Sequence, residues 1–318
     1  MKKAVAGLAL LLALLAQAVP VCAAENQIAV MAAENFYGDI ARQIGGDRVS
    51  VVSIMNNPDQ DPHLFETTPG IVRQIAAAQI VILNGGNYDS WMDKLLAAGP
   101  RRDRIVINAA KLTGYKPGDN PHLWYDPATM PAVAAAIADA LAKADSTHAS
   151  EYSARLKITL AALDQITQRV AQLKAKHGGA PVTATEPVFG PMARALGLTM
   201  RNERFQLAMM NDTEPSARDV AAFESDLKER KVRLLIYNSQ VSEKLTERLR
   251  DIAKRTKVPV IGVSETMPAN VKFQDWLLGE LDVLDKLLSS PNRPLVGTTT
   301  SILGPPAAAV ASRPASAL

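Results

Sequence analysis

Two histidines and two glutamates stand at positions where an α/β fold places ligand-binding side chains. His63 follows a predicted strand over 49–54, and His122 follows another over 105–107. Glu186 comes directly after a predicted strand over 182–185, and Glu265 follows one over 258–263. Ligands of parallel α/β sheets bind beyond the carboxyl ends of the strands. Two imidazoles and two carboxylates could surround a divalent transition metal, and the carboxylates would offset its charge.

Each of these residues alone has an ordinary structural explanation. A loop histidine is commonly solvated or hydrogen-bonded locally, and a glutamate near a helix N-terminus is favoured by the helix dipole. A proline precedes both His63 and His122; it stiffens the loop, which suits a fixed ligand and equally a tight turn. Each half of the chain contributes two of these candidate ligands, and this joint placement favours a metal site between the halves. The other two histidines, His148 and His177, flank a long predicted helix, and we expect them at the surface.

Short β-branched runs alternate with amphipathic stretches, which predicts an α/β fold with parallel sheets. Strands are expected over 28–31, 49–54, 80–83 and 105–107, and again over 182–185, 205–209, 232–237 and 258–263. Between these halves, residues 150–176 have apolar positions three and four apart with no internal Pro or Gly, and they end at Gly178-Gly179. Such a helix would be about 40 Å long and would connect two lobes rigidly.

The N-terminus has the pattern of a secretory leader. Lys2 and Lys3 precede an apolar run, and small residues follow at Ala23 and Ala24. Cleavage there would remove Cys22 and release a periplasmic protein. Acylation of Cys22 in a lipoprotein is the less favoured alternative, because no small residue precedes it. The expected segments are a leader over 1–24, an N-terminal lobe over 25–148, a connecting helix over 149–177, a C-terminal lobe over 178–290 and a disordered tail over 291–318.

Composition excludes several classes of function. Among 318 residues, 35 Lys and Arg against 32 Asp and Glu give a net charge of +3. Since Lys2 and Lys3 belong to the leader, the remaining chain is close to neutral, which argues against a nucleic-acid partner. A single cysteine excludes both a disulfide framework and a cysteine zinc site.

Five segments form a combination that is specific to one protein family. With them, the sequence from about Ile28 to Leu288 resembles the metal-binding solute-binding proteins of ABC importers, of the zinc and manganese type. The segments are 61–69 (DPHLFETTP), 82–85 (ILNG), 121–127 (PHLWYDP), 185–198 (TEPVFGPMARALGL) and 259–266 (PVIGVSET).

The resemblance implies a fold of two four-stranded α/β lobes joined by one long helix, with the metal in the cleft between them. His63 and His122 fall on the two imidazole ligands of the family. Glu186 falls where zinc-importing members commonly have a third histidine and manganese-type members a glutamate. Glu265 falls on the last carboxylate ligand, which is most often Asp. The implied protein catalyses no reaction; we expect a monomer that delivers its metal to the membrane permease of an ABC importer.

A carboxylate in place of an imidazole makes the site harder, which favours Mn²⁺ or Fe²⁺ over Zn²⁺. The segment 115–120 also lacks the histidine-rich loop that many zinc importers carry. Zinc is not excluded, since it binds histidines and carboxylates well.

Two other functions stay open from the residues alone. One is a secreted metal-dependent hydrolase, although four protein ligands would fill a tetrahedral site and no HExxH motif occurs. The other is a binding protein for an organic solute, in which these His and Glu residues are structural. For a binding protein with a long connecting helix, we expect small lobe motions rather than wide closure.

Overall fold

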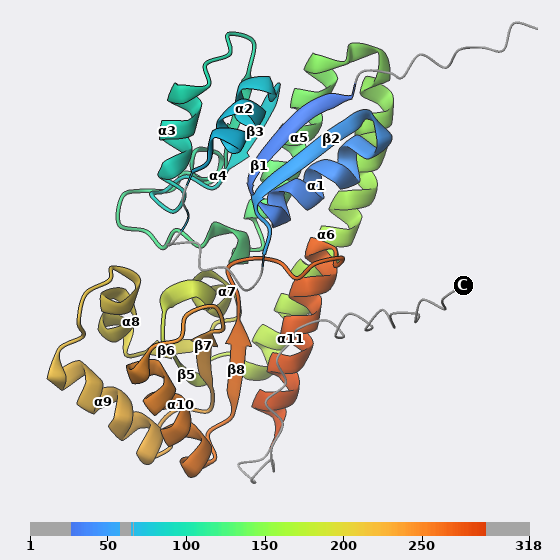
Figure 1. Cartoon of the computed structure of the whole chain (residues 1–318). Helices are drawn as coiled ribbons and strands as arrows, with labels where there is room; N and C mark the ends of the chain where they lie inside the picture. The colour runs from blue at the N-terminus through green and yellow to red at the C-terminus, as the bar shows by residue number, and fades with distance from the viewer. Residues whose placement is uncertain (1–26, 58–64, 66, 291–318) are drawn as a thin grey trace, which may run out of the picture.

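Two four-stranded parallel sheets form the framework of the chain in a computed structural model that describes residues 27–57, 65 and 67–290 (Figure 1). The predicted leader over 1–24, His63 and the predicted tail over 291–318 lie outside the described residues. The first sheet has the order β2-β1-β3-β4 and the second β6-β5-β7-β8, and all the strand pairs are parallel. The predicted fold class, two α/β lobes joined by a long helix, is confirmed.

The described part of the N-terminal lobe contains four strands and five α-helices. Its second helix shows how local sequence sets an element, because the Thr68 hydroxyl accepts a hydrogen bond from the backbone of Ile71, and Pro69 occupies the first turn. The elements are β1 (Ile28–Glu34), α1 (Asn35–Gly45), β2 (Val49–Met55), α2 (Pro69–Ala77), β3 (Ile80–Leu83), α3 (Trp91–Ala98), β4 (Ile105–Asn108), α4 (Ala109–Thr113) and α5 (Thr129–Ala144).

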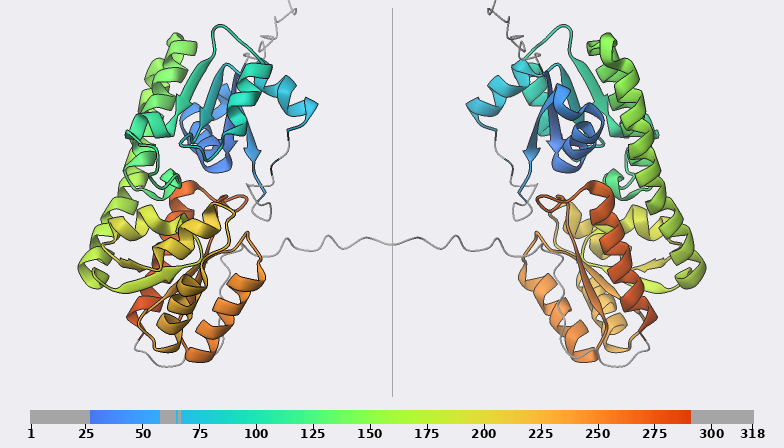
Figure 2. Two further views of the ribbon diagram at one scale, coloured as in Figure 1. Left: turned by 90° about the vertical axis from the view of Figure 1, so that its left-hand side faces the viewer. Right: turned by 90° about the vertical axis from the view of Figure 1, so that its right-hand side faces the viewer.

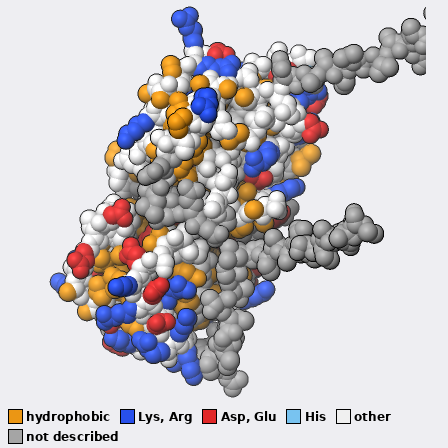
Figure 3. Space-filling view, in the orientation of Figure 1, with side chains coloured by type: hydrophobic (Ala, Val, Ile, Leu, Met, Phe, Trp, Pro, Cys, Tyr) orange, Lys and Arg blue, Asp and Glu red, His pale blue; other side chains and the backbone are white. Residues whose placement is uncertain are grey.

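The C-terminal lobe repeats this arrangement. The Ser216 hydroxyl caps α9 by accepting from the backbone of Asp219. The elements are β5 (Pro181–Ala184), α7 (Gly190–Ala195), β6 (Thr199–Arg201), α8 (Glu203–Met210), α9 (Ala217–Lys228), β7 (Leu235–Asn238), α10 (Lys244–Thr256), β8 (Val260–Val263) and α11 (Phe273–Ser289). Over α9 and α10 the surface carries charges of both signs (Figure 3), and Glu224 pairs there with Lys228 and Arg248.

The connecting helix α6 (Ala149–His177) has 29 residues, which corresponds to about 43 Å. It runs along one side of both lobes (Figure 2) and packs against α1 and α5 in the first lobe and α11 in the second. The prediction of an uninterrupted helix is therefore confirmed. Among the described residues, no helix combines the length and apolar character needed to cross a membrane.

One predicted element is wrong. The stretch 205–209, expected as a strand, belongs to helix α8, and the strand beside β5 is Thr199–Arg201. The apolar run around Phe205 was the misleading signal, since a short run of this kind does not distinguish a strand from a buried helix turn. Phe205 is fully buried and packs edge-on against Phe223 of α9, with ring centroids 4.8 Å apart. Packing between two helices thus determines the conformation here.

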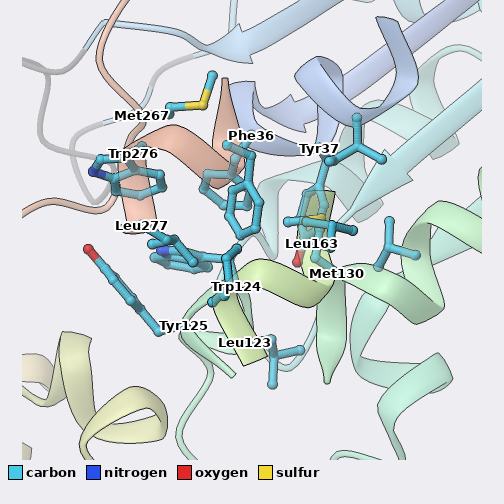
Figure 4. Packing of buried hydrophobic residues seen from close by; sticks show 14 of the residues in the cluster. Phe36, Tyr37, Leu123, Trp124, Tyr125, Met130, Leu163, Met267, Trp276 and Leu277 are labelled. Atoms are coloured by element: carbon cyan, nitrogen blue, oxygen red, sulfur yellow. The ribbon is translucent and has the colours of Figure 1, made fainter. Parts of the chain in front are cut away.

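The main hydrophobic core extends across both lobes (Figure 4). Phe36 of α1 stacks on Trp124, with centroids 4.8 Å apart, and lies 6.4 Å from Trp276 of α11. Trp124 and Tyr125 belong to a 3₁₀ turn, Leu123–Tyr125, that directly follows His122. The residue predicted as a ligand is therefore attached to rigid aromatic packing at the junction of the lobes.

Candidate metal site

Three of the four predicted site residues lie together where the lobes meet. The exposed fractions of His122, Glu186 and Glu265 are 2%, 6% and 0%. Nε2 of His122, from the N-terminal lobe, lies 3.5 Å from Oε2 of Glu265, which follows β8 in the C-terminal lobe. His63 is outside the described residues. An imidazole and a carboxylate from opposite lobes thus approach each other in a buried position.

Asn238 joins the two glutamates. Its Nδ2 donates to Oε2 of Glu186 at 3.1 Å and to Oε1 of Glu265 at 2.7 Å. Asn238 is the last residue of β7, and β7 lies between β5 and β8 in the sheet, so Glu186 and Glu265 follow the two strands that flank it. The amide hydrogens partly offset two buried negative charges, which a divalent cation would offset more fully.

Asn120 fixes the orientation of the His122 ring. Nδ1 of His122 and Oδ1 of Asn120 are 2.7 Å apart, and the same oxygen accepts from the His122 backbone at 3.0 Å. An amide oxygen can only accept, so Nδ1 carries a proton, and Nε2 is the ring nitrogen that faces Glu265. Nδ2 of Asn120 donates to the Pro187 carbonyl at 2.6 Å, across the lobe junction. Histidines that bind metals are commonly held by a second hydrogen bond of this kind.

Aromatic side chains surround the imidazole. The rings of Trp124 and Tyr88 lie 5.4 Å and 5.8 Å from that of His122. Burial, followed by the negative charges of Glu265 and Glu34, raises the pKa of the Tyr88 phenol well above its ordinary value. The phenol therefore stays neutral, and the site has apolar walls that strengthen electrostatic interactions inside it.

Across the described residues, no group of three or more His, Cys, Asp or Glu side chains is arranged to hold a metal ion. Two carboxylates and one imidazole nevertheless converge, with the Asn238 amide between the carboxylates. Asn238 bonds one oxygen of each carboxylate, Oε2 of Glu186 and Oε1 of Glu265, while the second oxygen of Glu265, Oε2, faces His122.

Sequence reasoning missed Glu34, a further carboxylate near the site. Glu34 ends β1, is 0% exposed, and neither of its carboxylate oxygens has a hydrogen-bond partner among the described residues. Burial, together with the negative charge of Asp89, raises its pKa well above the ordinary value. Its position at the carboxyl end of a strand could have identified it, because ligands bind beyond these strand ends and the same rule identified Glu186 and Glu265.

The two remaining histidines lie elsewhere, and the surface prediction is wrong for one of them. His177 is 6% exposed, and its Nε2 lies 2.8 Å from Oδ1 of Asp285 on α11. The packing of α6 on α11 covers it. His148 is partly exposed and lies 2.7 Å from Asp145 through Nδ1. Each histidine therefore contacts an aspartate near one end of α6.

Known proteins match nearly the whole described chain. A family model described as "zinc-uptake complex component A periplasmic" matches residues 30–287. The zinc-binding protein TroA of Treponema pallidum is 25% identical over 251 residues, which cover 76% of this chain and 80% of that protein. The manganese-binding lipoprotein MntA of Bacillus subtilis is 25% identical over 231 residues, covering 70% and 74%. The solved structure of TroA superposes with a TM-score of 0.71 at 21% identity, covering 83% of this chain and 100% of that one.

Proposed function

Since the chain belongs to the family of periplasmic zinc-uptake component A proteins, we propose that it captures a divalent transition metal between its lobes and delivers it to an ABC importer. The observation that carries this proposal is the approach of His122 to Glu265 across the lobe junction, with Nε2 and Oε2 3.5 Å apart. A site built from both lobes couples metal binding to lobe geometry, which is what capture and release require.

The proposed ligands are His63, His122, Glu186 and Glu265. Support comes from the burial of the three described residues, from the His122 ring that Asn120 orients, and from the two carboxylates gathered at Asn238. The donor set contains two imidazoles and two carboxylates, so we favour Mn²⁺ or Fe²⁺ over Zn²⁺ as cargo. The relatives include a protein named for zinc and one named for manganese, so kinship alone does not select the metal.

The proposed action involves no chemical reaction. Preset ligands supply the binding energy, and contact with the permease would change the lobe geometry enough to release the ion. We propose that the protein acts as a monomer and lacks hydrolase activity. Assays with ester, peptide and phosphate substrates in the presence of Mn²⁺ or Zn²⁺ should give no turnover above the free metal.

We further propose that the chain works outside the cytoplasm after removal of residues 1–24. MntA is named a lipoprotein, so acylation of Cys22 is the alternative to be tested. The intact mass and the N-terminal sequence of the mature protein distinguish the cleaved form from the acylated form. A start at Ala24 or Glu25 supports the cleaved soluble form, whereas a lipid-modified N-terminal Cys22 supports the anchored form.

Metal titration of the exported protein tests the proposed function. After dialysis against a chelator, the wild type should bind one equivalent of Mn²⁺ or Zn²⁺, measured by elemental analysis. The double variant His122→Ala/Glu186→Ala should retain no stoichiometric metal while keeping the circular dichroism of the wild type. His148→Ala removes a histidine far from the site and should bind normally. Stoichiometric metal in the double variant would contradict the site, and a wild type that binds none of the metals would contradict the function.

A further inference from the structure

The carboxyl group of Glu34 is buried without compensation. It is 0% exposed, and neither oxygen has a hydrogen-bond partner among the described residues. Leaving a buried charged acceptor unsatisfied costs more than the loss of an ordinary hydrogen bond, and such groups are rare in folded proteins. A carboxylate in this position therefore indicates a partner that binds there.

Glu34 lies beside the candidate metal site. The next residue, Asn35, forms two hydrogen bonds with the backbone of Met267, at 2.6 Å through Nδ2 and 2.9 Å through Oδ1. Met267 is two residues beyond Glu265, so the end of β1 is attached to the loop that carries this glutamate. The negative charges of both Glu34 and Glu265 raise the pKa of the Tyr88 phenol, so both carboxyl groups lie near this ring. The Asn35–Met267 bonds and the electrostatic effect on Tyr88 therefore put Glu34 on the same side of the lobe junction as Glu265.

Two polar neighbours of Glu34, Tyr37 and Asp89, have other partners. The Tyr37 hydroxyl donates to Oδ1 of Asn84 at 2.8 Å. Asp89 accepts from the backbone amides of Asn84 and Gly85, both at 2.7 Å, and its own carboxylate repels that of Glu34. These neighbours leave the ionised form of Glu34 uncompensated, which is consistent with its raised pKa, and a bound cation would compensate it.

Building on the proposed function, we infer that Glu34 supplies a carboxylate oxygen to the captured ion and biases the site toward hard divalent metals. With Glu34, the described residues contribute three carboxylates and one imidazole. Oxygen-rich donor sets suit Mn²⁺ and Fe²⁺, whereas Zn²⁺ binds well with fewer ligands of mixed nitrogen and oxygen character. Loss of Glu34 should therefore weaken Mn²⁺ binding more than Zn²⁺ binding.

The variant Glu34→Met tests this inference, because it keeps the length of the side chain and removes both oxygens. Competition with a chelating indicator would measure the affinities for Mn²⁺ and Zn²⁺. We expect the Mn²⁺ affinity to fall at least tenfold and the Zn²⁺ affinity less than threefold. X-ray absorption of the Mn²⁺ complex should show one oxygen ligand fewer. Glu224→Gln, a buried carboxylate paired with Lys228 on α9, is the control and should leave both affinities unchanged.

The thermal stability of the metal-free variant separates a ligand from a structural residue. If Glu34 is a ligand that is retained at the expense of stability, the metal-free variant Glu34→Met should have a melting temperature equal to or higher than that of the metal-free wild type. A lower melting temperature with unchanged relative affinities for Mn²⁺ and Zn²⁺ would overturn the inference. Equal affinities in variant and wild type would also overturn it while leaving the proposed function intact. Only a wild type that binds no metal would reject the proposed function.

Discussion

The side-chain amide of Asn238 stands between two buried carboxylates. Its bonds to Glu186 and Glu265 are both charge-assisted. The variant Asn238→Ala should therefore lose about 1–3 kcal/mol of unfolding free energy in the presence of a chelator. Urea denaturation would measure this loss. Saturating metal should reduce the difference in unfolding free energy between variant and wild type, because the ion then offsets the negative charges of the carboxylates.

A neighbouring residue provides the control for this prediction. Ser239 donates one hydrogen bond to the Val263 carbonyl at 2.9 Å in the same part of the sheet. Ser239→Ala should cost about 1 kcal/mol or less, with or without metal. If Asn238→Ala is as stable as the wild type in chelator, Asn238 does not stabilise the paired carboxylates.

The residues of the site differ in how far the sequence could predict them. The strand-end rule found His122, Glu186 and Glu265, which the structure brings together; their role as ligands stays a prediction. The rule should also have included Glu34, which ends β1. Tyr88 and the role of Asn120 could not be predicted, because the effect of Glu265 on Tyr88 and the bond from Asn120 to Pro187 depend on how the lobes dock.

At the scale of the elements, one acidic residue of α11 accepts several hydrogen bonds from α6. Asp285 of α11 accepts from Lys176 at 2.7 Å, His177 at 2.8 Å and Arg169 at 2.9 Å, all on α6. The hydrogen bond from Lys176 is the main cause that holds the pKa of Asp285 well below its ordinary value. The ionised carboxylate thus attaches the connecting helix to the second lobe.

The variant Asp285→Asn should lose about 1–3 kcal/mol of unfolding free energy at pH 7. Because the pKa of Asp285 is lower in the folded than in the unfolded state, this stabilisation is complete above the ordinary pKa of 3.8. It disappears as the pH falls through the lower folded value, so the difference from the wild type should shrink below about pH 4. Thermal unfolding between pH 3 and 7 would measure it.

Asp282 provides a matched control on the same helix. It also pairs with Arg169, at 2.8 Å, but its side chain is 59% exposed. Exposed pairs contribute little, so Asp282→Asn should cost less than about 1 kcal/mol. Equal losses in the two variants would show that the network of α6 donors around Asp285 has no special role.

Most elements were predictable because the alternation of β-branched runs and amphipathic stretches reports burial directly. The region around α8 was the exception. The short, mostly apolar stretch 205–209 does not reveal whether its partner will be a strand or a helix, and α8 packs on α9. For the same reason His177 was predicted at the surface, since its partner Asp285 is 108 residues away in the sequence.

At the scale of the whole molecule, a buried acid lies at the junction of the lobes. Burial raises the pKa of Glu280 on α11 from 4.5 to about 8. Its Oε1 lies 3.2 Å from the Tyr125 hydroxyl, which donates to the Ser264 carbonyl at 2.9 Å. One hydroxyl proton cannot serve both acceptors at full strength, so a neutral Glu280 that donates to Tyr125 satisfies all three groups.

This arrangement predicts a pH-dependent stability that the variant Glu280→Gln abolishes. Because the pKa is higher in the folded state, the stabilisation is complete below about pH 4.5 and is lost as the pH rises through 8. Between pH 5 and 9, the unfolding free energy of the wild type should fall by a few kcal/mol relative to that of Glu280→Gln. Chemical denaturation across this range would measure the difference. The control Asp275→Asn, at an exposed position of α11, should show the same dependence of unfolding free energy on pH as the wild type. If Glu280→Gln also shows that dependence, the prediction is contradicted.

The way the lobes are joined also limits how far they can move. One hydrophobic core includes residues of both lobes, and α6 packs against helices of each. Hydrogen bonds between Asn35 and Met267, Asn120 and Pro187, and Tyr125 and Ser264 cross the junction close to the proposed ligands. Wide opening would break these bonds and expose Phe36 and Trp124 to water, at a cost that one ion is not expected to repay.

We therefore expect metal capture to proceed through side-chain rotation and small rigid-body shifts. X-ray scattering with chelator and with saturating Mn²⁺ should give radii of gyration that agree within about 0.5 Å, as expected for shifts without hinge closure. Hydrogen exchange should instead slow in the segments around His122 and Glu265, where the ion would suppress local opening. A larger change in radius would mean that the shared core separates during binding, and α6 would then act as a hinge rather than as a rigid connection.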